Sequence, residues 1–127
     1  ISKKFIEQKK GTIVGISSAG AVRGKTSNIV YGSAKGGFDH YLAGLRQYLH
    51  PKGIRVVTIR PGFVATKMTK GLDLPEKLTA TSDQVAKTIV KHALKGNRNI
   101  VYTKPIWRPI SWIIRNIPEP IFKRKQL

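Results

Sequence analysis

The hydrophobic residues of this chain fall into two kinds of pattern. Mostly apolar, β-branched runs cover residues 11–17, 54–60 and 99–102, and such short runs are typical of buried strands. Apolar residues recur close to every 3.6 positions over 28–50 and again over 81–94, which is the spacing of amphipathic helices. The pattern therefore predicts three strands separated by two long helices.

Turn and capping residues set the expected ends of these elements. Pro51-Lys52-Gly53 ends the first long helix, Gly96-Asn97 ends the second, and Thr81 or Ser82 caps the start of the second. From Pro61 to the cap we expect a loop with one helical turn. Strands joined through helices run parallel with right-handed crossovers, so the predicted fold class is α/β with a parallel sheet of about three strands.

Composition limits the partners and the chemistry. The 127 residues fit one domain, and 24 Lys and Arg against 6 Asp and Glu give a formal charge of +18, which favours polyanions, anionic cofactors or acidic membranes as partners. The chain has no cysteine, which excludes disulfides and thiolate zinc sites and suits a cytoplasmic protein. His40, His50 and His92 are dispersed without metal-ligand spacing, so we predict no metal site.

One segment after the first predicted strand nearly matches a phosphate-binding P-loop. Gly24-Lys25-Thr26 supplies the second half of that motif, but Ala19 stands where its first glycine should be. The helical period starts several residues too late, and no Asp follows a strand to hold magnesium. We therefore interpret Arg23, Gly24 and Lys25 as a solvated basic turn.

The same segment contains a second candidate chemistry. Reduction of a carbonyl by hydride needs a proton donor and a polar group that holds the oxygen as charge develops. Tyr31 and Lys35 lie four apart on the first predicted helix and so project from one face, where the cation favours the phenolate. Ser18 follows the first strand, and Gly36-Gly37 leaves room for a ligand beside the helix. Ligands of parallel sheets bind at the carboxyl ends of strands, where Ser18 and Pro61-Gly62 both lie.

These motifs together resemble the short-chain dehydrogenase/reductase family. The strand IVGIS, Ser18 thirteen residues before Tyr31, YGSAK, and RVVTIR followed by PGFVAT occur in the family's order over residues 11 to about 70. The resemblance implies the C-terminal half of a Rossmann-like doubly wound parallel sheet, whose first nucleotide-binding half is absent. It also implies NAD(P)-dependent hydride transfer between a carbonyl and an alcohol, and a homo-oligomer formed through the Tyr-bearing helix.

The resemblance assigns roles to individual residues. Tyr31 is the implied general acid, Ser18 the hydrogen-bond donor to the substrate oxygen, and Lys35 the cation that makes the phenol more acidic and binds the nicotinamide ribose. Ser17 is the alternative serine, which we expect instead to satisfy local backbone. The residues implied in binding NAD(H) or NADP(H) are Tyr31, Lys35, Pro61, Gly62, Val64 and Thr66.

Two parts of the family's pattern have no counterpart in this sequence. Neither its Gly-rich dinucleotide turn nor its active-site Asn is present, and residues 1–10 resemble the end of a helix. We therefore expect a fragment, inactive alone, with residues 1–103 forming the C-terminal half of the reductase domain. Residues 104–127 form a basic, Trp-containing helical tail.

The tail leaves two interpretations open. Trp107 and Trp112 stand among Arg and Lys in an apolar stretch too short to span a bilayer. It lies on an anionic membrane, or it covers the crevice as a lid or subunit contact. The tail, YGSAK and RPGFVATKM together resemble the corresponding segments of reductases that act with an oxidase partner in epimerising decaprenylphosphoryl ribose. Those reductases reduce a keto-sugar that is attached to a polyprenyl phosphate.

A different class of function is also consistent with the charge. A non-catalytic basic module would bind membrane or nucleic acid through its lysines and arginines. The sequence has no recognition-helix, RNP-like or zinc-finger pattern. We therefore expect no specific nucleic-acid partner and a cytoplasmic protein, peripheral to the membrane if the tail docks there.

Overall fold

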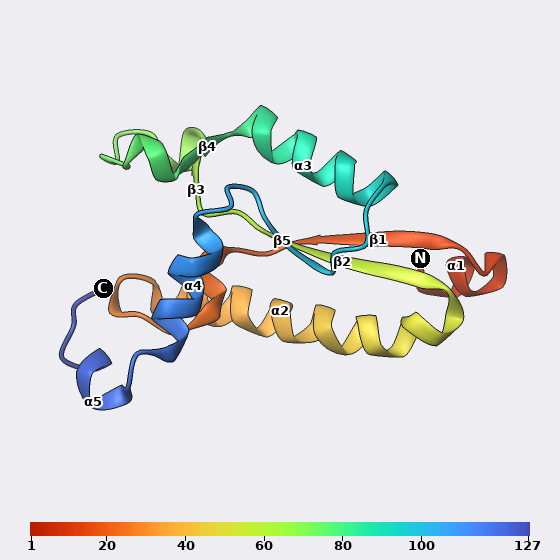
Figure 1. The fold of residues 1–127 in the computed structure, drawn as a ribbon, viewed down its shortest axis with the longest axis horizontal. Helices are drawn as coiled ribbons and strands as arrows, with labels where there is room; N and C mark the ends of the chain where they lie inside the picture. Colours follow the sequence, from red (N-terminus) through yellow and green to blue (C-terminus); the bar gives the residue numbers. More distant parts are fainter.

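The computed structural model describes residues 1–127, which form two small parallel sheets with helices around them (Figure 1). The strands are β1 (Gly11–Ile16), β2 (Ile54–Arg60), β3 (Phe63–Ala65), β4 (Thr79–Thr81) and β5 (Ile100–Tyr102). The α-helices are α1 (Ser2–Gln8), α2 (Ile29–Leu49), α3 (Ser82–Leu94), α4 (Trp107–Asn116) and α5 (Glu119–Phe122). Short 3-10 turns include η1 (Ala19–Val22), η2 (Thr26–Asn28), η4 (Lys67–Thr69) and η5 (Glu76–Leu78).

The main sheet has the parallel order β1-β2-β5. Gly11 pairs with Ile54 and Ile16 with Ile59, while Arg60 pairs with Tyr102 at the far end. Helix α2 covers one face and α3 the other, and α4 lies near the carboxyl ends of the strands (Figure 1). The α/β class and the three strands predicted from the sequence are confirmed.

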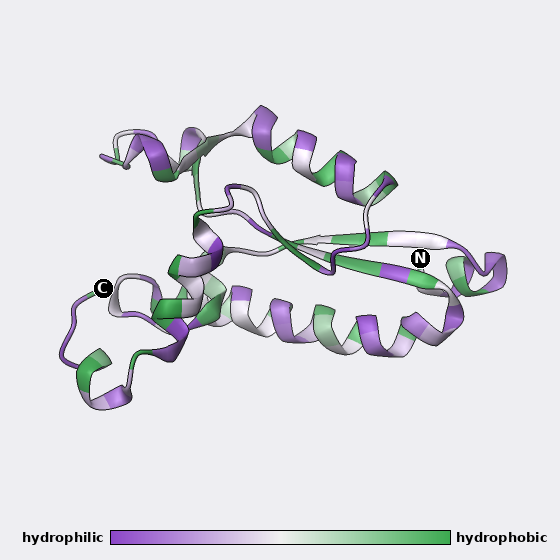
Figure 2. Ribbon diagram, in the orientation of Figure 1, coloured by the Kyte–Doolittle hydropathy of each residue, from purple (hydrophilic) through white to green (hydrophobic).

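The core lies between the sheet and the helices, and Figure 2 shows hydrophobic stretches along the strands and at intervals along the helices. Leu42 and Leu49 of α2 pack with Ile54 and Val56 of β2 in one buried cluster. A second cluster joins alternate β2 residues to β5, with partly buried partners in β1 and α3: Val57, Ile59, Val101, Val14 and Ile89. Because β2 buries side chains on both faces, it reads as a continuous apolar run rather than an alternating one.

One glycine allows α2 to approach the sheet closely. A Cβ built on Gly15 would lie 2.3 Å from Cδ1 of Leu42, so any side chain there would displace a buried core residue. The glycine inside the first strand therefore has a packing reason.

The segment between β2 and α3 differs from the prediction. In place of a loop with one turn, β3 and β4 pair in parallel, Phe63 with Thr79 and Ala65 with Thr81, and 3-10 turns lie between them. Strands of three residues are too short to show a hydrophobic period, so the sequence did not reveal them. The predicted cap is confirmed, because the Thr81 hydroxyl accepts from Gln84 N and Gln84 Oε1 accepts from Thr81 N.

The two ends of the chain are helical, as expected. Helix α1 precedes β1, and the tail forms α4 and α5. None of the helices combines the length and the apolar content that crossing a bilayer requires.

Candidate functional site

A serine loop follows β1 at the carboxyl edge of the sheet. Ser18 is 8% exposed, and its Oγ accepts a hydrogen bond of 3.0 Å from Gly20 N, which caps η1. Backbone hydrogen bonds of 2.8 Å run from Ser17 N to Ile59 O and from Ala19 N to Pro61 O. The ends of β1 and β2 are therefore tied together, and the Ser18 loop lies beside Pro61.

Tyr31 lies in the first turn of α2 and faces the same loop. Its side chain is half-exposed, with 43% of the residue accessible. A Cβ built on Gly20 would lie 3.4 Å from Ser18 Oγ and 3.9 Å from Cε1 of Tyr31. Ser18 and Tyr31 therefore both lie close to Gly20, and the Asn28 amide nitrogen lies 3.0 Å from the same Cβ position.

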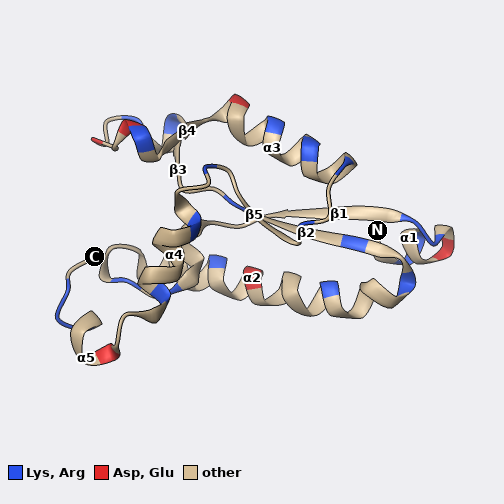
Figure 3. Ribbon diagram, in the orientation of Figure 1, with Lys and Arg blue, Asp and Glu red and all other residues tan.

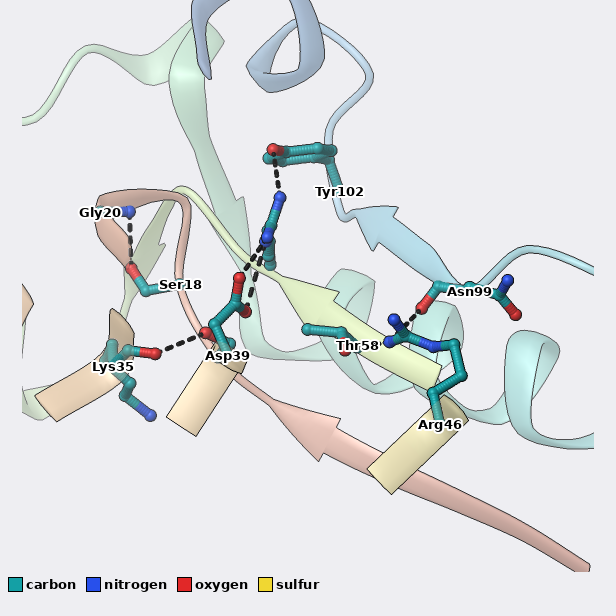
Figure 4. A network of polar contacts seen from close by, with 10 residues as sticks. Ser18, Gly20, Lys35, Asp39, Arg46, Thr58, Asn99 and Tyr102 are labelled. Atoms are coloured by element: carbon teal, nitrogen blue, oxygen red, sulfur yellow. Dashed lines mark hydrogen bonds and ion pairs between the residues drawn. The ribbon is translucent and has the colours of Figure 1, made fainter. Parts of the chain in front are cut away.

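Lys35 lies one helical turn beyond Tyr31. Its Nζ donates a hydrogen bond of 3.1 Å to Ile16 O, the last carbonyl of β1. Its own backbone oxygen accepts a hydrogen bond of 3.4 Å from the Ser17 hydroxyl, which Figure 4 marks at Lys35. The Ser17 hydroxyl thus joins the end of β1 to α2, 18 residues further along the chain, and does not bond the local backbone as the sequence suggested. The Ser18 hydroxyl only accepts, so its proton is available to a ligand.

Asn28 lies between the serine loop and α2 and was not singled out from the sequence. Its Oδ1 is buried without a hydrogen-bond partner, and its side chain lies 3.0 Å from a Cβ built on either Gly20 or Gly32. An Asn just before a helix usually signals an ordinary cap, but Asn28 makes no side-chain cap bond. Its amide is a further polar group beside Tyr31.

The predicted cofactor residues lie in two places. Pro61 is buried and Gly62 partly buried next to the serine loop, whereas Thr66 lies beyond β3, where it lines a cleft of about 610 Å³ with Thr79 and Thr81. Val64 is partly buried in β3 between them. Proximity to the Ser18 loop is therefore shown for Pro61 and Gly62 only.

Trp107, the first residue of α4, covers the Pro61-Gly62 turn. Its Nε1–H donates a hydrogen bond of 2.9 Å to Leu78 O, and its ring meets Phe63 edge-on at 5.1 Å between centroids. A Cβ built on Gly62 would lie 1.8 Å from the Trp107 Nε1. The glycine is required here for close approach of the indole.

We expect Gly62→Ala to destabilise the protein by about 1–3 kcal/mol, as overpacking does in cores. The indole is buried and hydrogen-bonded, so it cannot move away without losing its contacts. Urea unfolding measures the change, and Gly24→Ala is the control because a Cβ on Gly24 meets no atom within 4 Å. Equal stabilities of the two variants would contradict the packing role of Gly62.

A buried ion network lies behind the site and was not predicted (Figure 4). Arg60 pairs with Asp39 through Nε and Nη2, and its Nη1 donates to Tyr102 Oη at 3.1 Å. Arg46 donates to Val56 O at 2.8 Å, Thr58 Oγ1 at 2.6 Å and Asn99 O at 3.2 Å. The network ties α2 to both β2 and β5.

The pKa values of these two guanidinium groups shift in opposite directions. Burial alone would lower the pKa of Arg60, but hydrogen bonds to Asp39 and Tyr102 and the charge of Asp39 outweigh burial and raise it. Burial lowers the pKa of Arg46; Asp39 opposes that shift and Arg60 adds to it. Asp39 is therefore the carboxylate that balances both cations.

The predicted solvated turn at Arg23 is wrong. The Arg23 side chain is 17% exposed, pairs with Glu119 at 2.6 Å, donates to Ile114 O at 3.1 Å and lies 3.6 Å from the centroid of the Phe122 ring. These partners belong to the tail, some 90 residues away, so the local sequence could not show them. Arg23 therefore fastens α4 and α5 to the serine loop.

The near P-loop does not form a phosphate cradle. Residues 19–22 make the 3-10 turn η1, and α2 begins only at Ile29, after a second 3-10 turn that starts at Thr26. A P-loop requires a helix N-terminus at its Lys and Thr. Gly24-Lys25-Thr26 has no such helix, which agrees with the prediction that this segment is not a P-loop.

Comparison with known proteins gives matches over most of the chain. Residues 1–77 match the family model described as short chain dehydrogenase. An uncharacterized oxidoreductase of Mycobacterium tuberculosis is 36% identical over 115 residues, covering 91% of this chain and 45% of that protein. An uncharacterized oxidoreductase of Streptomyces coelicolor is 36% identical over 118 residues, covering 93% and 46%. The chain thus spans about half the length of these relatives.

The fold also matches solved structures. A short chain dehydrogenase from Burkholderia cenocepacia, crystallised in complex with NADP, superposes with a TM-score of 0.80 at 20% identity, covering 97% of this chain and 50% of that one. At this identity the likeness concerns the fold, and it agrees with the predicted half of a Rossmann-like sheet. Since the family model matches more than half of its residues, this chain belongs to the short-chain dehydrogenase family.

Proposed function

We propose that the protein containing this chain is an NAD(P)-dependent oxidoreductase that transfers hydride between the nicotinamide and a carbonyl or alcohol. The observation that carries the proposal is that Ser18 Oγ and the Tyr31 ring both lie beside Gly20, with Lys35 one turn further along α2. Family membership and the NADP-bound structure of similar fold support the choice of cofactor.

In the reductive direction, a bound reduced nicotinamide would supply the hydride, with its two electrons, for the carbonyl carbon. Tyr31 donates its phenolic proton to the oxygen, which completes the alcohol. Ser18 donates a hydrogen bond to that oxygen and stabilises the charge that develops on it. Lys35, held at the Ile16 carbonyl, places a positive charge on the same helix face as the phenol.

The residues near this site fit the nicotinamide end of the cofactor. Lys35 uses one of its three ammonium donors on Ile16 O, which leaves two for the ribose hydroxyls. Pro61 and Gly62 lie beside the serine loop through the hydrogen bond from Ala19 N to Pro61 O. In this proposal the backbone of Pro61, Gly62 and Val64 meets the carboxamide, and Thr66 contacts the cofactor with its hydroxyl.

For the substrate, we propose a keto-sugar carried on a polyprenyl phosphate, turned over with an oxidase partner. The formal charge of +18 and the basic tail favour an anionic, lipid-linked molecule. Trp112 and Ile113 of α4 are 68% and 55% exposed, which suits a peripheral contact with the membrane that holds it. Exposed aromatic residues on α2, Tyr41 and Tyr48 among them, support assembly of a homo-oligomer through that helix.

The two adjacent serines provide a matched test. In the full-length protein, we expect Ser18→Ala to lower kcat by about 10²–10³-fold, as loss of one donor to a developing oxyanion does. Ser17→Ala removes only the contact to Lys35 O and should lower kcat by less than about tenfold. Oxidation of NADPH and of NADH, each with a panel of ketones and aldehydes, gives kcat and KM. A larger loss for Ser17→Ala, or no carbonyl turnover by the wild-type protein, would contradict the proposal.

A further inference from the structure

Helix α4 and the end of β5 enclose a cleft that the proposed reaction does not use. The cleft has a volume of about 230 Å³, and the lining residues that matter here are Arg60, Tyr102, Arg108, Ser111, Trp112 and Arg115. Positions 108, 111, 112 and 115 follow the i, i+3, i+4, i+7 spacing, so one face of α4 carries two arginines, a serine and a tryptophan. The helix thus presents a set of donors together.

The charge of this cleft is not compensated within the chain. Arg60 is paired with Asp39. The other ion pair of the structure joins Arg23 to Glu119, so Arg108 and Arg115 have no carboxylate within ion-pair distance. Helix α4 carries no Asp or Glu (Figure 3). An anion is therefore the kind of ligand that the cleft would attract.

Ser111 points to such a ligand independently of charge. The residue is 3% exposed and lines the cleft, yet its Oγ is buried with no hydrogen-bond partner. A serine inside a helix commonly points to solvent or bonds the carbonyl four residues earlier, and Ser111 does neither. A buried hydroxyl without a partner is destabilising, so an acceptor that enters the cleft would satisfy it.

We propose that this cleft binds a phosphoryl group, with Arg108 and Arg115 holding its oxygens, Ser111 donating a hydrogen bond and Trp112 contacting the organic part of the ligand. Arginine suits phosphate because its planar donors match the oxygens in pairs. The cleft lies at the far end of η1, which Ser18 caps and whose last residue, Val22, lines the cleft. Binding there does not require that Ser18 and Tyr31 catalyse hydride transfer.

Titration of the purified full-length protein with pyrophosphate tests the site, using calorimetry and tryptophan fluorescence. Arg108→Gln and Arg115→Gln should each weaken binding by about tenfold or more. Arg98→Gln is the control, because it removes the same charge from the loop before β5 and should leave binding unchanged. Equal losses in all three variants would reduce the site to general electrostatic attraction and overturn the proposal.

Ser111→Ala separates a ligand role from a structural one. The site predicts weaker pyrophosphate binding without a lower melting temperature, since the variant loses an unpaired buried hydroxyl. Sedimentation with phosphatidylcholine vesicles, with and without phosphatidic acid, asks whether a lipid supplies the phosphoryl group. Arg115-dependent binding to the acidic vesicles alone would assign the site to a lipid phosphate. The proposal would be overturned if neither pyrophosphate nor the acidic vesicles bound. It would also be overturned if Arg115→Gln dissociated an oligomer without changing pyrophosphate or vesicle binding. NADPH oxidation, measured separately, reports on the proposed reaction.

Discussion

Replacement of Tyr31 by Phe should lower kcat for NADPH-dependent carbonyl reduction by about 10³-fold in the full-length protein, within the range that a positioned general acid contributes. The substitution removes one oxygen from a half-exposed ring and leaves the packing of α2 unchanged. Binding of NADPH should persist, because Lys35 and the Pro61-Gly62 turn remain in place. The proton would then have to come from water, without the nearby Lys35 charge.

The control for this experiment lies on the same helix. Tyr41 is 61% exposed and stacks on Phe38, with 6.4 Å between ring centroids, so Tyr41→Phe makes the same chemical change on the same helix but away from the serine loop. We expect its kcat to match the wild type. Turnover by Tyr31→Phe within a few-fold of the wild type, with NADPH bound normally, would remove Tyr31 from the mechanism. Loss of NADPH binding would instead indicate damage to the cofactor site.

The long elements were predictable from the sequence because each carries its own signal. Helix α2 runs for 21 residues, and its apolar period and the Pro51-Lys52-Gly53 stop are local features. Strand β2 is buried on both faces, so its apolar run stands out between Gly53 and Pro61. By contrast, β3 and β4 are three residues each, and only their pairing across an intervening 3-10 segment makes them strands.

The same distinction applies to the candidate site. The spacing of Tyr31 and Lys35 on one helix is local, so the sequence predicted that they share a face. The anchoring of Arg23 by the tail and the approach of Trp107 to Gly62 join segments far apart in the chain. Charge patterning could not single out Arg23, because a basic chain offers many arginines and only tertiary contacts decide which of them become buried.

Asp39→Asn should destabilise the protein by about 3–5 kcal/mol, the usual loss when one member of a buried ion pair is removed. The Arg60 and Asp39 side chains are 14% and 11% exposed, so solvent screens them little. The variant leaves Arg60 and Arg46 facing each other without their shared carboxylate. Urea unfolding measures the loss, which is a large part of the about 5–15 kcal/mol typical of a domain.

Two further variants show whether the loss comes from charge. Asp73→Asn makes the same chemical change at an exposed loop position and should leave stability within about 0.5 kcal/mol of the wild type. Asp39→Leu combined with Arg60→Met removes both charges, and it should recover much of the stability, since buried pairs are often replaceable by apolar residues. Because Asp39 lies one turn beyond Lys35 and Arg60 directly precedes Pro61, Asp39→Asn should also raise KM for NADPH. An Asp39→Asn variant as stable as the wild type would show that another group compensates the charge of Arg60. The ion pair would then have no part in holding α2 against the end of β2.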